Sequence, residues 1–461
     1  MHPAATFPRP SCGRLRTPGP RQQGGWLPVG ALAAVLMLGG LPSPAPAASL
    51  LELYQRAEEV DPNLERSRKE RDIAAFQEDQ AQAGWLPRLT GQASRSRTKQ
   101  TQVISGQPET TDKFTQDRYS VTLTQPIYSG GRTWLSMDIA DTTQEKADAS
   151  VSQARQDLMI QVAQAYFDVL NAREEVDLAE REMNRVEEHL EQAQAQFDVG
   201  TGDIVGVREA EARRDQANTR LIRARNTLNT AKQRLRQFIR RPVPELDGVE
   251  EVNLAAPDPG TTEEWVERAL DANPQLEQTR KDLAIARKNA ELARRERWPQ
   301  LSAQAQYSKV EGGSFFTEDE QKSASLQLEW PLYQGGEVSA QADIEETRAA
   351  QTRLQLDDQQ ETVQVETVQA FYDWESAIEE VRSLRAQARS TETQLEAIQT
   401  GFEVGRRTSV DVLDAQQEYF AALQSLAEAR HSYLVSRLQL KAAAGVLNLA
   451  DLRSANRQLA D

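Results

Sequence analysis

The sequence is an internal duplication, and this feature constrains the fold more than any other. The segment 125–131 (QPIYSGG) returns 205 residues later as 330–336 (WPLYQGG). Nearer the start the offset is 212, as between 61–64 (DPNL) and 273–276 (NPQL), so the first copy carries seven extra residues between positions 87 and 126. Several blocks in the same order at a nearly fixed offset predict one structural unit that occurs twice.

Each copy predicts the same order of elements. A helix of about 35 residues (Leu50–Gly84 and Thr262–Arg297) is followed by two strands, a helix of about 65 residues, a glycine-containing turn and a helix of about 35 residues. At 1.5 Å per residue the longest helix would extend about 100 Å, far beyond the helices of globular domains. Apolar residues, many of them alanines, recur in these helices at spacings of three and four. This heptad pattern favours coiled-coil packing between long helices.

The repeat and its flanks define the expected boundaries. They are a cleaved signal peptide at 1–47, a first repeat at 48–245 with strands at about 86–103 and 115–128, a linker at 246–261, a second repeat at 262–450 with strands at about 299–311 and 321–332, and a C-terminal tail at 451–461. Each strand pair ends in a Pro-x-Tyr-x-Gly-Gly exit, whose residues are Pro126, Gly130, Gly131, Pro331, Gly335 and Gly336. Adjacent glycines after a strand predict a tight stop before the next helix.

The N-terminus has the composition of an export signal. Four arginines precede an apolar run at 26–41, which ends in prolines and an alanine-rich A-x-A site. We expect cleavage after Ala47, with cleavage after Ala48 and an uncleaved N-terminal anchor as the alternatives. The same segment contains Cys12, the only cysteine. The exported chain is therefore predicted to leave the cytoplasm and to contain no disulfide.

Composition excludes several classes of function. The 70 Asp and Glu residues outnumber the 54 Lys and Arg residues, for a formal charge of −16, whereas a nucleic-acid binder needs a basic face. The three histidines and the single cysteine are too few and too scattered for a zinc or iron–sulfur site. Neither a nucleophile–base set nor a phosphate loop is present. We therefore expect no nucleic-acid partner, no cofactor and no enzymatic activity.

The predicted strands alternate apolar and polar residues. Tyr119, Val121 and Leu123 alternate with Ser and Thr, and the stretches 301–307 and 324–330 alternate in the same way. About ten residues with one apolar and one polar face are typical of a transmembrane β-strand, although a solvent-facing hairpin alternates as well. Four strands cannot close a barrel, and an open edge cannot lie in lipid. If these strands are in a membrane, several chains must share one barrel.

The doubled helix–hairpin–helix–helix unit, its strand exits and the turns at 197–201 (FDVGT) and 402–415 (FEVGRRTSVDVLDA) resemble the TolC-like outer-membrane efflux and type I secretion channels. The resemblance covers essentially the whole exported chain. It implies a mostly α fold with a transmembrane β-barrel: a homotrimer in the outer membrane, with four strands per chain in a twelve-stranded barrel that continues as a coiled-coil periplasmic tunnel. It also implies docking to an inner-membrane transporter, of the ABC, RND or a similar class, through a periplasmic adaptor (membrane fusion) protein.

The resemblance also assigns candidate site residues. The turns at the periplasmic tip, where the adaptor would dock, are Val199, Gly200, Thr201, Val404, Gly405 and Arg406. The tunnel constriction or gate would be formed by Asp411, Asp414 and Arg407. We expect the thin seams at alanines such as Ala224 and Ala429 to support trimer assembly.

The residues themselves leave two interpretations of the acids. Asp411 and Asp414 are three positions apart and so share one helix face; gathered from three chains, they would attract cations and raise one another's pKa values. Alternatively, they offset the helix dipole after a Ser409 cap. In the family the closed tip is often locked by an ion pair between an acid in the turn of the first copy and an arginine in the turn of the second. Arg407 occupies the position of that arginine. Here Gly206 occupies the position of that acid. Asp203 lies close by and could replace the acid as the partner of Arg407. Alternatively, Arg407 is a solvated surface charge.

The alternative function is a soluble periplasmic coiled-coil adaptor or structural protein whose hairpins pack as ordinary β-domains. An adaptor normally inserts one helical hairpin into a β-rich chain, whereas here helices dominate and every element is duplicated. The exit duct of an efflux pump or a type I secretion system is therefore the favoured function. Drugs and secreted polypeptides are both compatible cargoes.

Overall fold

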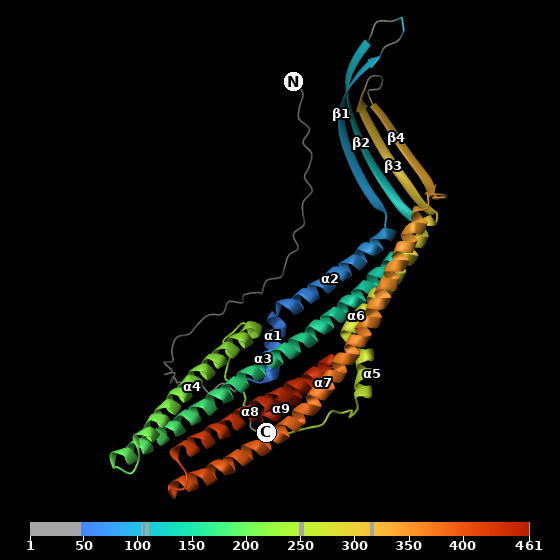
Figure 1. Ribbon diagram of the computed structural model, residues 1–461. Helices are drawn as coiled ribbons and strands as arrows, with labels where there is room; N and C mark the ends of the chain where they lie inside the picture. The colour runs from blue at the N-terminus through green and yellow to red at the C-terminus, as the bar shows by residue number, and fades with distance from the viewer. Residues whose placement is uncertain (1–47, 103–104, 107–109, 249–252, 314–317, 461) are drawn as a thin grey trace, which may run out of the picture. The chain divides into compact units, whose positions relative to one another are not determined.

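The computed structural model describes residues 48–102, 105–106, 110–248, 253–313 and 318–460. The predicted signal peptide lies outside these residues. In chain order the elements are α1 Leu50–Val60, α2 Pro62–Gln82, η1 Ala83–Trp85, β1 Arg88–Gln102, β2 Thr110–Tyr128, α3 Arg132–Asp198, α4 Ile204–Ile239, α5 Thr262–Ala272, α6 Pro274–Arg294, η2 Arg295–Arg297, β3 Gln300–Gly312, β4 Glu318–Glu329, α7 Glu337–Glu403, α8 Ser409–Ala443 and α9 Leu449–Ala460. The order from α1 to α4 recurs from α5 to α8, with α3 and α7 each 67 residues long (Figure 1).

The first helix of each copy is broken in two, where the sequence pattern predicted one continuous helix. The break falls at Asp61 in the first copy and at Asn273 in the second, both with extended backbone angles. A proline follows each of them, and proline disfavours the helical conformation of the preceding residue. The side chain of Asp61 then caps the new helix by accepting hydrogen bonds from the backbone of Asn63 (2.9 Å) and Leu64 (2.8 Å). The repeated D/N-P motif is therefore a stop and a restart.

The C-terminal residues predicted as a tail form a helix instead. Helix α9 begins after Asn448, whose side chain accepts a hydrogen bond from the backbone N–H of Ala450 (2.8 Å). Leu452 is fully buried in the main core, and Asp451 forms an ion pair with Lys441 of α8. The few apolar residues of this short segment suffice because they pack onto a core that the long helices have already built.

The four strands form one antiparallel sheet in the order β1-β2-β3-β4. The register places Leu89 opposite Leu123 and Ala303 opposite Leu326, so the alternating apolar residues near the helix ends of the four strands share one face. Phe114 and Val310, farther along, lie on the other face. Large side chains of this face are exposed in the single chain, with Leu123 at 40% and Leu326 at 71%. The opposite face carries Ser, Thr and Gln. An exposed apolar face on a sheet with two free edges requires a covering partner.

The strand exits turn the chain sharply into the long helices. Gly130, Gly131, Gly335 and Gly336 all have positive φ angles, which only glycine adopts without strain. A Cβ atom on Gly130 would also lie 2.8 Å from the Cβ of Trp298, so the first exit is in close contact with the second copy. Pro126 lies beside a register shift between β2 and β3, a place where a missing N–H is tolerated.

The long helices pack in pairs, α3 with α4 and α7 with α8 (Figure 1). Their core is continuous with the short helices and includes the fully buried Trp265, Tyr166 and Tyr433. Ala224 and Ala429 are 1% and 4% exposed within the single chain. These two alanines therefore pack helices of one chain together, and the dependence of trimer assembly on the alanine seams stays a prediction. Across the described ranges, no helix combines the length and apolarity needed to span a bilayer.

Candidate functional site

The two turns predicted as the periplasmic tip have the same backbone geometry. Gly200 and Gly405 are in the left-handed region, with φ values of 74° and 72°. In the first turn the N–H of Gly200 donates to the carbonyl of Phe197 (3.0 Å) and the N–H of Thr201 to that of Gln196 (2.9 Å). The second turn repeats both bonds. This pair of bonds is the Schellman motif, which ends a helix at a left-handed residue and satisfies its last carbonyls.

The tip turns are open to solvent. Val199 is 74% exposed and Val404 is 65% exposed. A Cβ atom on Gly200 or Gly405 would meet nothing within 4 Å. The glycines are thus required by backbone angle and not by crowding, and the two exposed valines are available to a docking partner.

The start of α8 is capped by Thr408, one residue before the predicted Ser409. The hydroxyl of Thr408 accepts a hydrogen bond from the N–H of Asp411 (3.3 Å), and Asp411 Oδ2 accepts one from the N–H of Thr408 (2.8 Å). These reciprocal bonds form a capping box. They hold the pKa of Asp411 below its usual value, through the backbone N–H first, then the Thr408 hydroxyl and the charge of Arg407. Within one chain Asp411 is therefore an ionised cap.

The predicted lock around Arg407 is not formed within the chain. Asp203 caps α4 instead, by accepting a hydrogen bond from the N–H of Gly206 (2.8 Å). Among the described residues, neither Asp203 nor Arg407 makes an ion pair within 4 Å. Arg407 is exposed to solvent at the turn of the single chain, and its part in a lock stays a prediction.

A different arginine joins the two copies. Arg213 of α4 forms an ion pair with Asp414 of α8 and donates a hydrogen bond to the side-chain oxygen of Gln417 (2.6 Å). The side chains of Arg213 and Asp414 are 28% and 54% exposed. Sequence reasoning missed Arg213. The duplication contains one sign of its importance. The residue that corresponds to Arg213 in the second copy, 205 positions later, is Glu418, so the charge at this position is opposite in the two copies.

The link belongs to a series of contacts that hold α8 on the first coiled coil. Leu413 of α8 packs between Val186 and Val207 of α3 and α4. The polar members of the series are His189 with Ser409 (2.7 Å), Arg213 with Asp414 and Gln417, Glu175 with Gln424 (3.5 Å), and Glu174 with Arg430 (3.8 Å) and His431 (3.4 Å). Most of these are single side-chain contacts at partly exposed positions, so each contributes little alone.

His189 is the second residue that sequence reasoning missed. It is 6% exposed, its Nε2 shares a hydrogen bond with Ser409 Oγ, and its ring lies 5.7 Å from that of Phe402. Burial lowers the pKa of His189. A lone histidine in a helical stripe gives no sign that its partner is the first residue of another helix, 220 positions later.

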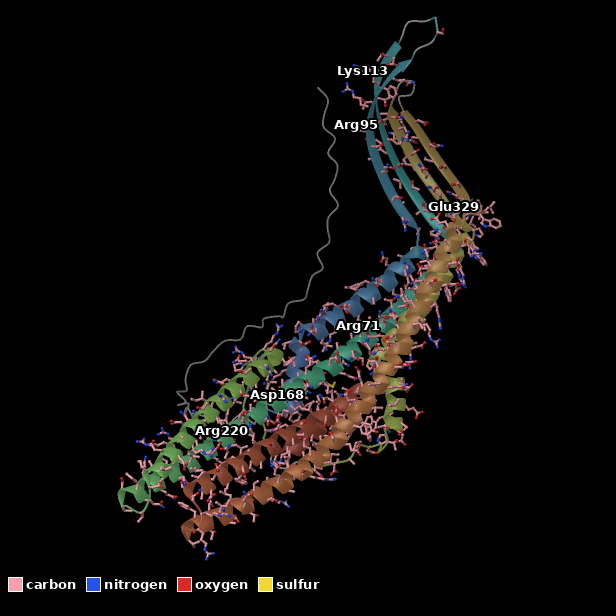
Figure 2. All side chains as sticks on the ribbon, viewed as in Figure 1. Arg71, Arg95, Lys113, Asp168, Arg220 and Glu329 are labelled. Carbon is pink, nitrogen blue, oxygen red and sulfur yellow. The ribbon has the colours of Figure 1, made fainter. Side chains whose placement is uncertain are left out.

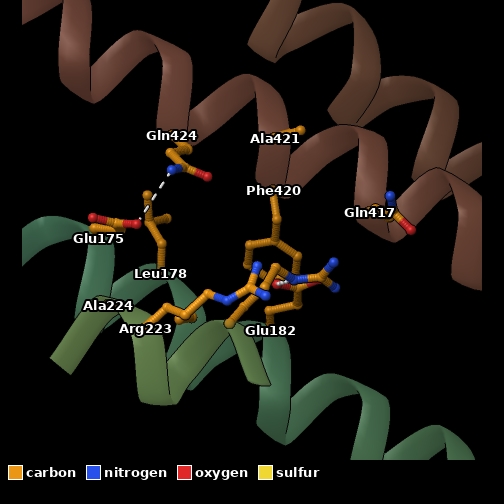
Figure 3. A pocket seen from close by; sticks show the side chains of 11 residues that line it. Glu175, Leu178, Glu182, Arg223, Ala224, Gln417, Phe420, Ala421 and Gln424 are labelled. Atoms are coloured by element: carbon orange, nitrogen blue, oxygen red, sulfur yellow. Dashed lines mark hydrogen bonds and ion pairs between the residues drawn. The ribbon is translucent and has the colours of Figure 1, made fainter. Parts of the chain in front are cut away.

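A cavity of about 270 Å³ lies beside the Arg213 link, between α3, α4 and α8. Figure 3 shows Phe420 of α8 pointing toward Glu182 on the other side of this space, and Gln417 at its rim. Glu182 is buried and accepts a hydrogen bond from Arg220 Nε (3.0 Å). This space is a part of the interface between α8 and the α3–α4 pair that side chains do not fill.

Comparison with known proteins agrees with this geometry. Residues 53–239 and 265–446, one segment in each copy, match the model of the family described as outer membrane efflux protein. The chain is 28% identical over 438 residues to the outer membrane protein TolC of Escherichia coli (strain K12), covering 92% of this chain and 87% of TolC. It is 26% identical to the alkaline protease secretion protein AprF of Pseudomonas aeruginosa, covering 88% and 86%. The CmeC outer membrane channel of Campylobacter jejuni superposes with a TM-score of 0.74 at 15% identity, over 95% of this chain and 98% of CmeC.

These matches confirm the predicted resemblance, fold class and location. The fold is that of trimeric channel-tunnels, mostly α with a transmembrane β-barrel, and the location is the outer membrane with a long periplasmic helical tunnel. The function class is an outer-membrane efflux or secretion channel and not the soluble adaptor. Proteins of this kind are transport channels that work with efflux or secretion pumps. This chain belongs to the outer membrane efflux protein family.

Proposed function

We propose that this protein is the outer-membrane exit duct of a tripartite efflux pump or type I secretion system. In this function the helix-pair turns are the entrance and the start of α8 is the gate. A periplasmic adaptor docks on the turns and connects the duct to an inner-membrane transporter of the ABC, RND or a similar class. The observation that carries the proposal is the ion pair between Arg213 and Asp414, one of the contacts that join the two coiled coils near their turns.

The geometry of the turns supports a docking role. Two solvent-exposed turns with the same backbone end the two helix pairs, and each presents one valine. Three chains would present six such turns around one opening. A partner that recognises a repeated backbone shape and a small apolar tip fits this arrangement. The first turn is shaped by Gly200 and Thr201, and the second by Gly405 and Arg406. The apolar contact with the adaptor would come from Val199 and Val404.

The contacts of α8 support a gating role. Asp414 is held by Arg213, Ser409 by His189, and Leu413 by the apolar residues of α3 and α4. Moving α8 and α7 away from α3 and α4 would break these contacts and widen the entrance. In the trimer, Asp411 and Asp414 would bring six carboxylates to this place and attract cations. Arg407 would lie at the rim as a mobile positive charge.

Two cargo classes fit the comparisons. The name of AprF refers to secretion of an alkaline protease, whereas the matched family is named for efflux. We assign this chain to the shared step, passage across the outer membrane.

Docking and gating are separable by variants of the exposed tip. Val199→Glu together with Val404→Glu should abolish export in cells that depend on this protein, because charge replaces the apolar contact. The same variant should keep its amount in the outer membrane and its conductance in planar bilayers, since both positions are exposed. Val199→Ala with Val404→Ala is the matched control and should retain export. Normal export by the glutamate variant would contradict docking at the tip.

A further inference from the structure

Another cavity, of about 530 Å³, lies where α3, α8 and the chain segment 245–248 meet. It lies along residues 170–181 of α3. In Figure 2 the labels Asp168 and Arg220 bracket this stretch, because Arg220 pairs with Glu182 of α3. The cavity has the size of many small-molecule sites. It shares no residue with the tip turns or with the Arg213 link.

Four acids line this cavity from two sides. Glu174 and Asp177 come from α3, and Glu245 and Asp247 come from the segment 245–248. The Glu245 carboxylate has a distant cationic partner, Arg173, at 3.9 Å. Among the described residues, the carboxylates of Asp177 and Asp247 form no ion pair within 4 Å. Two of the four acids are therefore available to a cation from outside the chain.

The two arginines that line the cavity are engaged by backbone oxygens. Arg173 donates a hydrogen bond to the carbonyl of Leu246 (3.3 Å), which holds the segment 245–248 against α3. Arg181 donates one to the carbonyl of Asp177 on its own helix (3.3 Å). Four acids against two arginines leave an excess of two formal negative charges in the cavity wall.

His431 of α8 forms part of the same wall and lacks a hydrogen-bond partner. It is 5% exposed, and neither ring nitrogen makes a hydrogen bond within the described part of the chain. Glu174 Oε2 lies 3.4 Å from Nε2. A neutral imidazole has one donor nitrogen and one acceptor nitrogen, and a carboxylate can serve only the donor. A buried acceptor without a donor costs free energy, so the wall lacks an N–H or O–H group that a ligand in the cavity would supply.

The arrangement of the acids indicates the shape of the ligand. In the ranges that the structure describes, no three carboxylate or imidazole side chains are close enough together to hold a metal ion. Acids spread over two segments instead match a cation with several N–H groups along a chain. An organic polyamine has ammonium groups separated by short methylene chains. The ammonium groups would form charge-assisted hydrogen bonds with the acids, and the methylene groups would pack on Leu170 and Leu246, which also line the cavity.

We propose that this cavity binds an organic polyamine cation. One ammonium group donates to the acceptor nitrogen of His431 and to Glu174, and another donates to Asp177 and Asp247. The bound polyamine thus links α8 to α3 and to the segment 245–248. The site is separate from the proposed entrance and gate, so its occupancy can be measured without a transport assay.

Calorimetric titration of the purified full-length protein with spermidine tests the proposal. We expect saturable binding of one spermidine per chain. Asp177→Asn together with Asp247→Asn should weaken binding by about tenfold or more, because charge-assisted hydrogen bonds are lost. His431→Phe should also weaken it, since the ring remains and the acceptor nitrogen does not. His431→Gln keeps an acceptor oxygen and should bind more tightly than His431→Phe.

The matched control is Glu187→Gln with Glu191→Gln. It removes the same charge from exposed positions of α3 that do not line the cavity, and it should bind spermidine as the wild type does. Because Asp177 lies on the surface, the aspartate variant tests the proposal even if the buried His431 variants fail to fold.

Four results would overturn the proposal. They are the absence of saturable binding, equal affinities in the aspartate variant and the control, and complete displacement of spermidine by Mg²⁺ at the same ionic strength, which would mean general charge screening. The fourth is binding that is lost in Asp411→Asn with Asp414→Asn but kept in the cavity variants, which would assign the polyamine to the acids of the entrance.

Discussion

Replacing Arg213 with alanine should favour the open channel. The Arg213–Asp414 pair is partly exposed, with side chains 28% and 54% accessible, so solvent screening leaves about 0.5–1 kcal/mol for each link. Three chains contribute three links, about 1.5–3 kcal/mol if the tip opens in one concerted step. That free energy corresponds to a ten- to one-hundred-fold increase, roughly, in the ratio of open to closed channels.

Single-channel recording in planar bilayers measures this ratio as an open probability. Arg214→Ala is the matched control, because Arg214 is the next residue of α4 but pairs with the adjacent Asp215 (2.7 Å) on the same helix. It should leave the open probability unchanged. Asp414→Ala should resemble Arg213→Ala, and the double variant should add little, since both variants remove one shared link.

Either of two results would refute this reasoning. One is an open probability for Arg213→Ala no higher than that of Arg214→Ala. The other is fully additive effects in the double variant, which would mean that Arg213 and Asp414 act through different partners.

Three further predictions concern stability. Gly405→Ala should cost only about 1–2 kcal/mol of turn strain. Gly445 has nearly the same φ (71°), but Gly445→Ala should prevent correct packing because its Cβ would lie 2.5 Å from the Cα of Asn273. Trimer yield and thermal midpoint compare the two variants, and equal effects would contradict the steric argument. Asp61→Ala and Asn273→Ala should each lower the free energy of unfolding by about 1–2 kcal/mol, because each removes a helix cap; an unchanged midpoint in thermal scans would show that the caps are dispensable. Burial lowers the pKa of His189, so its contribution to stability is present above the unfolded pKa of about 6.5 and is lost as the pH falls below that value. Acidification should therefore lower the thermal midpoint of the wild type more than that of His189→Gln. An equal drop in both proteins would contradict a role of His189 in the pH dependence of stability.

The fold was predictable because its determinants are local and repeated. Heptad spacing, strand alternation and glycine pairs each specify one element, and the duplication states each signal twice. The helix breaks at Asp61 and Asn273 are not evident from periodicity, because the helical pattern continues on both sides of a single proline. Helix α9 was missed because its stability depends on a core formed by other parts of the chain.

The candidate site was predictable only where backbone geometry determines it. The turn that ends a helix requires glycine at positions 200 and 405, and this requirement does not depend on contacts with distant residues. Arg213 and His189 act through residues about 200 positions away, and a single sequence carries no direct record of such pairs. For the same reason the cap fell on Thr408 and not on Ser409, since Ser409 is engaged by His189.

The most direct test of the proposed channel is the conductance of the purified wild-type protein in a planar bilayer. We expect a detergent-stable trimer that inserts and produces stepwise, cation-selective currents, because three chains close one barrel and gather their acids at the entrance. A protein that stays in solution as a monomer and produces no steps would contradict it.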